Sequence, residues 1–137
     1  IAGGVPCSIT LDKISGPGIM LVGDAARQVN PLSGGGIASG MIGGKIAGTI
    51  AGEAIKKNKL EHILTYDRAW NDRLGKRHET FNRIKEGIYN FSDDKFNSIA
   101  HSVLKIPIEK RTLGKVFTTA LINNPSLLVD IAKVFVV

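Results

Sequence analysis

A chain of 137 residues has the size of a single domain and is long enough to bury a core. Its hydrophobic content of 43% and charged content of 22% are ordinary for a globular protein, and no run of about 18 uncharged apolar residues predicts a transmembrane helix. The net charge of +6 fits a solvated surface, or contact with an anionic membrane surface or a phosphorylated substrate. Nucleic-acid binding is not expected, because neither zinc-finger spacing nor an aromatic RNP motif accompanies the charge.

The few reactive side chains argue against several kinds of site. The single cysteine, Cys7, cannot form an intrachain disulfide, so it predicts a reducing, cytoplasmic setting and a role as a small hydrophobe. The three histidines share no metal-ligand spacing with the cysteine or with one another, so no metal site is predicted. His78, which follows Lys76 and Arg77, is expected on a solvated helix face.

Short strands and turns are predicted at the start of the chain. Residues 8–11 alternate as a short strand would, and a turn follows at residues 15–18. Residues 19–22 form a continuous apolar run between turn signals, as expected of a strand buried on both faces. Gly23 and Asp24 end this strand, which therefore leads directly into a loop.

A glycine-rich helix is predicted next, over residues 37–57. Glycine recurs here every four residues, at Gly36, Gly40, Gly44, Gly48 and Gly52. Each interior glycine costs about 1 kcal/mol relative to alanine, so the helix needs a compensating close approach to another backbone or to a flat ligand. Lysines at position 45 and at the helix end favour packing against a sheet over pairing inside a membrane.

Helices are predicted for the rest of the chain. Apolar residues from Trp70 to Phe91 follow a four-three stepping, which predicts one long helix with a buried stripe. Ser92 is the expected N-cap of a short helix that ends near Ala100. A further helix is expected over residues 109–122, and a final apolar helix after residues 124–126. The predicted fold class is therefore mainly α with a small β portion.

The segment that predicts chemistry is the strand, loop and helix start at residues 21–37. A glycine after a buried strand lets a ligand touch the backbone, and the Asp24 carboxylate can accept hydrogen bonds from hydroxyl groups. A helix whose first turn lacks side chains exposes its unpaired N–H groups and the positive end of its dipole. These residues therefore predict a polar, partly anionic ligand between the strand end and the helix start.

The same segment resembles the second FAD motif of glutathione-reductase-type flavoproteins. Residues 21–26 read LVGDAA and residues 31–37 read PLSGGGI, which match the GDAA…PxxGxG pattern of aromatic hydroxylases, halogenases and geranylgeranyl reductases. The resemblance implies that Asp24 holds the ribityl chain, and that the later stretch lies beside the isoalloxazine ring with the helix N-terminus at its pyrimidine edge. It assigns FAD-binding roles, and no catalytic ones, to Gly23, Asp24, Pro31, Gly34, Gly35, Gly36 and Ile37.

Within this superfamily the sequence is most similar to the archaeal geranylgeranyl reductases of the digeranylgeranylglycerophospholipid reductase family. The likeness rests on Gly-Gly-Val-Pro at residues 3–6, on the loop at residues 25–31 and on the glycine-rich helix. It implies an FAD-dependent oxidoreductase that saturates a polyprenyl lipid with electrons from a separate donor, as a cytoplasmic enzyme peripherally associated with the membrane surface. Residues 1–58 would be the C-terminal portion of a Rossmann-like FAD/NAD(P)-binding domain, and residues 59–137 a C-terminal helical region.

The first FAD motif of that superfamily, GxGxxG at a strand–helix turn, has no match in the sequence. The nearest approach has Gly34 and Gly36 but Ser39 where the last glycine should stand. Only half of the FAD site is encoded, so the chain is expected to be a fragment that is inactive alone and binds FAD weakly or not at all. Two alternatives stay open: a fragment of an FAD-dependent monooxygenase of the aromatic hydroxylase type, and a helical interaction module without a cofactor.

Overall fold

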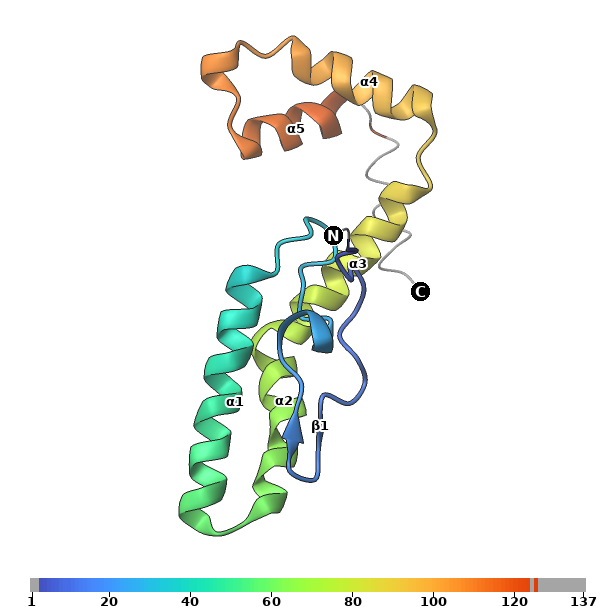
Figure 1. Cartoon of the computed structure of the whole chain (residues 1–137). Helices are drawn as coiled ribbons and strands as arrows, with labels where there is room; N and C mark the ends of the chain where they lie inside the picture. Colours follow the sequence, from blue (N-terminus) through green and yellow to red (C-terminus); the bar gives the residue numbers. More distant parts are fainter. Residues whose placement is uncertain (1–2, 124, 126–137) are drawn as a thin grey trace. The chain divides into compact units, whose positions relative to one another are not determined.

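The computed structural model describes residues 3–123 and 125, and helices dominate there over a very small sheet (Figure 1). The chain divides into two compact units, Ile1–Asn82 and Arg83–Val137. The predicted fold class, mainly α with a small β portion, is confirmed. None of the described helices is both long enough and apolar enough to cross a membrane.

A β-hairpin opens the regular structure of the first unit. Strand β1 (Ser15–Gly16) pairs antiparallel with β2 (Ile19–Met20), and Gly18 takes a φ of +75° in the turn between them. The prediction of a strand buried on both faces over residues 19–22 is wrong: pairing stops at Met20, and Ile19 is 57% exposed. The reason is that β2 has a partner on one side only within the described residues.

The strand predicted at residues 8–11 is also absent from the described part of the chain. The N–H of Leu11 donates instead to the carbonyl of Ala26 (3.4 Å), which belongs to the short 3-10 helix η1 (Gly23–Ala26). Residues 8–11 therefore end beside the 3-10 helix η1 and do not pair with a neighbouring strand.

Helix α1 (Ile37–Lys57) has the bounds that the sequence predicts. Asn58 ends it in the left-handed conformation, with its N–H bonded to the last-turn carbonyls of Ala54 and Ile55. Gly40 lies nearest to another backbone, where an added Cβ would meet the Gly23 Cα at 3.6 Å, an ordinary contact, whereas an added Cβ at Gly48 or Gly52 would meet no described atom within 4 Å. Contact with another backbone therefore does not require these glycines, and the flat ligand stays a prediction. The expected packing on a sheet is replaced by packing on η1, on the 3-10 helix η2 (Leu60–Thr65) and on α2 (Tyr66–Trp70), because the hairpin strands are too short to form a platform.

The predicted long helix consists of three consecutive segments. After α2 the chain forms a π-helical turn, η3 (Asn71–Gly75), and continues as α3 (Lys76–Tyr89). An added Cβ at Gly75 would lie 2.5 Å from the Asn71 Oδ1, so only glycine leaves room for that side chain to fold back over the turn. The π turn is a feature that apolar spacing alone did not predict.

The second unit contains helix α4 (Asp93–Leu104), the 3-10 turn η4 (Ile108–Lys110) and helix α5 (Leu113–Asn123). The predicted cap of α4 is confirmed, because the Ser92 Oγ accepts the N–H of Lys95 (3.3 Å), but the helix continues past Ala100. The helix predicted from residue 109 begins later, because residues 108–110 form their own turn. The predicted final helix after residue 126 lies outside the described residues.

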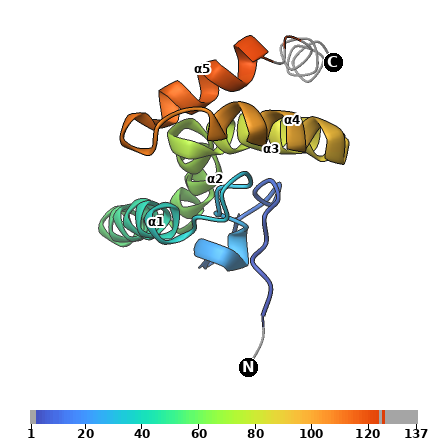
Figure 2. The same ribbon diagram turned by 90° about the horizontal axis from the view of Figure 1, so that it is seen from above.

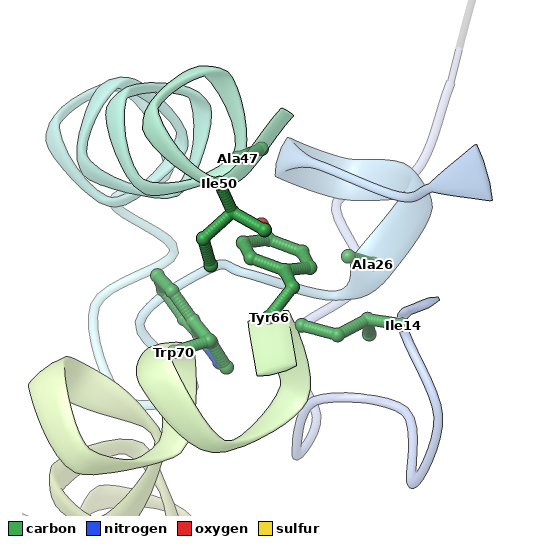
Figure 3. Close-up of a cluster of buried hydrophobic side chains, with 6 residues drawn as sticks. All are labelled: Ile14, Ala26, Ala47, Ile50, Tyr66 and Trp70. Atoms are coloured by element: carbon green, nitrogen blue, oxygen red, sulfur yellow. The ribbon is translucent and has the colours of Figure 1, made fainter. Parts of the chain in front are cut away.

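The core of the first unit lies between α1, η1 and α2, and Figure 3 shows its main side chains. Tyr66 and Trp70 of α2 are 0% and 2% exposed, and they pack with Ile14, Ala26, Ala47 and Ile50. Figure 2, a view along α1, shows α2 beside it. The first compact unit thus includes residues beyond the predicted boundary at 58/59, which stays a prediction about the domains of a longer flavoprotein.

Candidate functional site

The loop from Gly23 to Gly36 has a buried inner side and an exposed outer side. Asp24 and Arg27 are exposed, and so is Ile37 at the end of the loop, at 85%. Four residues of the loop point inward and are buried: Ala26, Gln28, Val29 and Pro31. The inner residues fix the loop to the core, and the outer ones remain available to a ligand.

Gln28 is the central anchor of this loop. Its Oε1 accepts the N–H of Gly23 (2.9 Å), and its Nε2 donates to the hydroxyl of Tyr66 (2.8 Å). The Tyr66 hydroxyl in turn donates to the carbonyl of Gly43 in α1 (3.4 Å). Burying the Gln28 amide costs little free energy when its oxygen and its nitrogen are both hydrogen-bonded. Burying the same amide without partners would be strongly unfavourable. The network therefore holds η1, α1 and α2 in one arrangement.

Gly43 leaves the space that Gln28 occupies. An added Cβ at Gly43 would collide with the Oε1 of Gln28. Burial raises the pKa of the Tyr66 hydroxyl, although its hydrogen bond from Gln28 acts in the opposite direction. The hydroxyl therefore keeps its proton and can accept from Gln28 while it donates to Gly43.

Asn30 organises the second half of the loop. Its Oδ1 accepts the N–H groups of Leu32 (3.0 Å) and Ser33 (3.2 Å), as in an Asx turn. Its backbone bonds the loop end, with the N–H donating to Gly35 (3.0 Å) and the carbonyl accepting from Gly34 (2.9 Å). Gly34 takes a φ of +72°, which a residue with a Cβ would adopt only with strain. The three glycines are thus held in a closed turn immediately before α1.

The Asp24 carboxylate lies beside the N-terminus of α1. An added Cβ at Gly36 would lie 3.3 Å from the Asp24 Oδ1 and 3.3 Å from a methyl group of Val29. No side chain caps the helix at Gly36, so the first-turn N–H groups keep their capacity to donate. A carboxylate acceptor and a set of helix donors therefore stand side by side on the exposed side of the loop.

The structure distributes the seven predicted residues over this arrangement. Gly23 begins η1 with a φ of +67°, and Asp24 and Gly36 are brought together across the loop. Pro31 is buried, which gives it a part in shaping the loop. The other three, Gly34, Gly35 and Ile37, lie in the turn and at the helix start.

Several residues that support the site were missed in the sequence. Asn30 could have been found, because asparagine before a proline is typical of turns. Gln28 and Gly43 carry no such signal, and their partner Tyr66 lies 38 residues from Gln28. Their roles depend on tertiary contacts that local spacing does not contain.

His78 is placed differently from the prediction. Its side chain is 3% exposed and meets the Trp70 ring edge-on, with 5.6 Å between centroids. The π-helical turn before it carries more residues per turn than an α-helix, so the residues that follow are rotated relative to regular α-helical spacing. Burial, with a smaller contribution from Arg77, lowers the pKa of the His78 imidazole. His78 is therefore a buried, neutral residue of the first unit.

A pocket of about 400 Å³ lies elsewhere in the first unit. Residues 9–12 and Ile14 form one side of it, and α2 and η3 contribute Asp67, Arg68, Trp70, Asn71 and Gly75. Its lining includes none of the predicted FAD-binding residues. Among the described residues, no group of histidine, cysteine and acidic side chains could hold a metal ion.

Comparison with known sequences finds relatives of the chain among archaeal lipid reductases. No protein-family model matches. The chain is 36% identical to digeranylgeranylglycerophospholipid reductase 2 of Methanococcoides burtonii and 38% identical to the digeranylgeranylglycerophospholipid reductase of Methanosarcina mazei, each over 98% of its length. The chain spans 34% of each of these relatives. The predicted resemblance is confirmed, and it extends through the helical tail.

A solved structure has a similar fold. It is a geranylgeranyl bacteriochlorophyll reductase-like protein from Thermoplasma acidophilum, which matches 96% of the chain with a TM-score of 0.77 and 28% identity. The match again covers 34% of the larger protein. The chain is therefore similar, in sequence and in fold, to one third of a longer reductase.

Proposed function

We propose that the chain is part of an FAD-dependent oxidoreductase that saturates isoprenoid double bonds of archaeal membrane lipids. The observation that carries the proposal is the Asp24 carboxylate beside the uncapped N-terminus of α1, in a chain whose relatives are named digeranylgeranylglycerophospholipid reductases. In this proposal the chain supplies the half of the FAD site that holds the ribityl chain and the flavin ring.

The residues present fit that half of FAD. Asp24 is an exposed acceptor, which suits the ribityl hydroxyl groups. The first-turn N–H groups of α1, at the positive end of the helix dipole, suit a ring edge with partial negative charge. Gly34, Gly35 and Gly36 place no side chain above the turn, so a flat ring could lie against the backbone.

The flavin, when bound and reduced by the separate electron donor, would supply a hydride to a carbon–carbon double bond, and a proton from elsewhere would complete the saturation. The chain's own contribution is to bind and orient. Gln28 and Tyr66 hold the Gly23 turn, and Asn30 holds the glycine turn, so that Asp24 and the helix donors keep a fixed separation. Leu32 and Ile37, 43% and 85% exposed, add an apolar surface at the helix start that would keep water from the ring.

The remainder of the predicted architecture belongs to the same proposal. The apolar run at residues 19–22 would extend a Rossmann-like parallel sheet supplied by the other part of the longer protein. The pyrophosphate and adenine would be held by that part, which is why this chain alone is expected to bind FAD weakly. The likeness to lipid reductases also supports two further parts of the proposal: a separate electron donor reduces the flavin, and the longer protein lies peripherally at the membrane surface.

A fragment of an aromatic hydroxylase would use the same motif, but the relatives found are named reductases, which favours the reductase. A fusion in which residues 1–137 replace the matching third of the Methanosarcina relative separates the two. We expect the fusion, given a chemical reductant without oxygen, to saturate a geranylgeranyl lipid. In a parallel assay with oxygen, oxygen consumption with a hydroxylated product would count against the proposal. So would a flavin-loaded fusion that leaves the lipid unchanged.

A further inference from the structure

The end of α4, the connection after it and the start of α5, together residues 104–115, present large apolar side chains to solvent. Leu104 is 64% exposed and Ile108 is 72% exposed. They stand on either side of Pro107, which is itself exposed. We call this segment the α4–α5 corner.

The corner has a defined internal structure. The side chain of Ile106 points inward and is 6% exposed. The Arg111 guanidinium donates to the carbonyl of Ile106 from Nε (2.9 Å) and to the carbonyl of Leu104 from Nη2 (3.3 Å). The N–H of Lys110 donates to the carbonyl of Pro107 (2.9 Å), which closes η4. The exposed positions of Leu104 and Ile108 therefore follow from a hydrogen-bonded turn.

Positive charge is concentrated in the same stretch of sequence as these two apolar side chains. Residues 104–115 contain Lys105, Lys110, Arg111 and Lys115 against the single acid Glu109, a net charge of 4 − 1 = +3. All five charged residues are exposed. Exposed apolar side chains among cations are typical of a surface that binds anionic lipid.

Exposed apolar residues in the first unit lie among less positive charge. Ile37 and Met41 of α1 are 85% and 72% exposed, and Lys45 is the one cation within residues 28–45. Ile55 and Leu60, 80% and 57% exposed, lie among three lysines, but the two glutamates of residues 53–61 reduce the net charge there to 3 − 2 = +1. The α4–α5 corner carries the larger net charge beside its exposed apolar side chains, so its complement is an anionic bilayer.

We propose that the α4–α5 corner docks the protein on an anionic lipid bilayer. Leu104 and Ile108 enter the boundary between headgroups and acyl chains, and Lys105, Lys110 and Lys115 lie at the level of the lipid phosphates. The biological purpose of this docking rests on the proposed function, since the substrate would be a membrane lipid. The docking itself requires neither FAD nor turnover.

The test is co-sedimentation of the full chain with vesicles of phosphatidylglycerol and phosphatidylcholine in equal parts, compared with vesicles of phosphatidylcholine alone. We expect binding to the mixed vesicles that weakens as salt is added. The variant K105Q/K110Q/K115Q is expected to bind about a hundredfold more weakly, at about fivefold for each cation near the surface. The variant L104S/I108S is expected to bind at least about tenfold more weakly.

Matched controls come from exposed residues of the first unit. K13Q/K56Q/K59Q removes the same net charge, and I55S/L60S removes two exposed apolar side chains of similar size. Both controls are expected to bind within about threefold of the unchanged chain, because screening confines the attraction to charges near the lipid. Circular dichroism of each variant would confirm that it is folded.

Three results would overturn the proposal: no binding to the mixed vesicles, equal binding to phosphatidylcholine alone, or equal losses in the corner variants and their controls. Self-association without vesicles that L104S/I108S abolishes would also overturn it, since the corner would then bind a second copy. A failed flavin or turnover assay leaves vesicle binding untouched. The two proposals can therefore fail separately.

Discussion

The two compact units of this chain are stabilised in different ways. In the first, hydrogen bonds join residues far apart in sequence: Ile14 with Asp67, Gln28 with Tyr66, and Trp70 with Thr10. In the second, Arg111 bonds carbonyls only five and seven residues before it. Of the side chains described over residues 83–123, those of Ser102 and Ile106 are buried.

The difference indicates where a precise geometry is required. The first unit fixes a loop through a closed core and a buried amide, as expected where a ligand must meet an acceptor and helix donors at once. The second unit buries few of its described side chains, as expected of a region that depends less on a fixed core of its own. The first unit should therefore be sensitive to small changes, and the second tolerant of larger ones.

The largest contrast is expected between two aromatic truncations. Trp70→Ala should lower the free energy of unfolding by about 3–5 kcal/mol, because it empties the core beside Tyr66 and removes the bond to Thr10. Phe96→Ala in α4 should cost about 1 kcal/mol, since that ring is already 44% exposed. Urea denaturation followed by circular dichroism measures both. If the two variants lost similar amounts of unfolding free energy, the contrast between the two units would be wrong.

Two glycines of α1 should respond in opposite directions to alanine. Gly43→Ala should destabilise the first unit by about 1–3 kcal/mol, because the new methyl group displaces Gln28. Gly48→Ala meets no atom within 4 Å and should stabilise the helix by up to about 1 kcal/mol. The fluorescence of Trp70, the single tryptophan, reports unfolding of this unit in both variants. If Gly43→Ala left the free energy of unfolding unchanged, the Gln28 network would not be rigid.

A smaller effect is expected from removing one hydroxyl. Tyr66→Phe leaves the buried Gln28 amide without an acceptor and should cost about 1–2 kcal/mol. Tyr89→Phe is the control, because Tyr89 is 76% exposed and should tolerate the change within about 0.5 kcal/mol. Thermal unfolding of the two variants side by side distinguishes them. If the two variants lost the same stability, the buried Gln28–Tyr66 hydrogen bond would contribute little to the stability of the first unit.

The smallest effect is a dependence on pH. The folded state lowers the pKa of His78 below its ordinary 6.5, so the unfolded chain takes up this proton first as the pH falls. Its contribution to stability is therefore complete above pH 6.5 and is lost as the pH falls from there through the folded pKa. Comparing the unchanged chain with His78→Phe across this range isolates the contribution. If the stability of the two proteins changed with pH in the same way, His78 would not be a buried neutral histidine.

Much of the structure around the candidate site could be predicted from the sequence because its signals are local, while the FAD-binding role of its residues stays a prediction. Gly23, Asp24 and the glycines before α1 form a short contiguous pattern, and the bounds of α1 follow from its own residues. The strand at residues 19–22 failed for the opposite reason. An apolar run fixes its preference to be buried, but pairing depends on neighbouring strands, and β2 pairs with β1 alone in the described chain.

The π-helical turn marks a similar limit in the helical region. Apolar spacing predicted one helix from Trp70 to Phe91, whereas the helix begins at Tyr66 and is interrupted at residues 71–75. In this turn the Asn71 side chain lies over Gly75, a contact that apolar spacing does not encode. One change of helical register was enough to misplace His78.

The most direct test of the central claim is flavin binding by the fusion in which residues 1–137 replace the matching third of the Methanosarcina relative. We expect a yellow protein with one FAD per chain, while residues 1–137 alone retain little or none. Asp24→Ala should weaken FAD binding by at least about tenfold through loss of a charged acceptor, and Asp12→Ala, an exposed control, should leave it unchanged. A folded fusion that binds no flavin, or one in which Asp24→Ala binds FAD as tightly as before, would contradict the assignment of this loop to the FAD site.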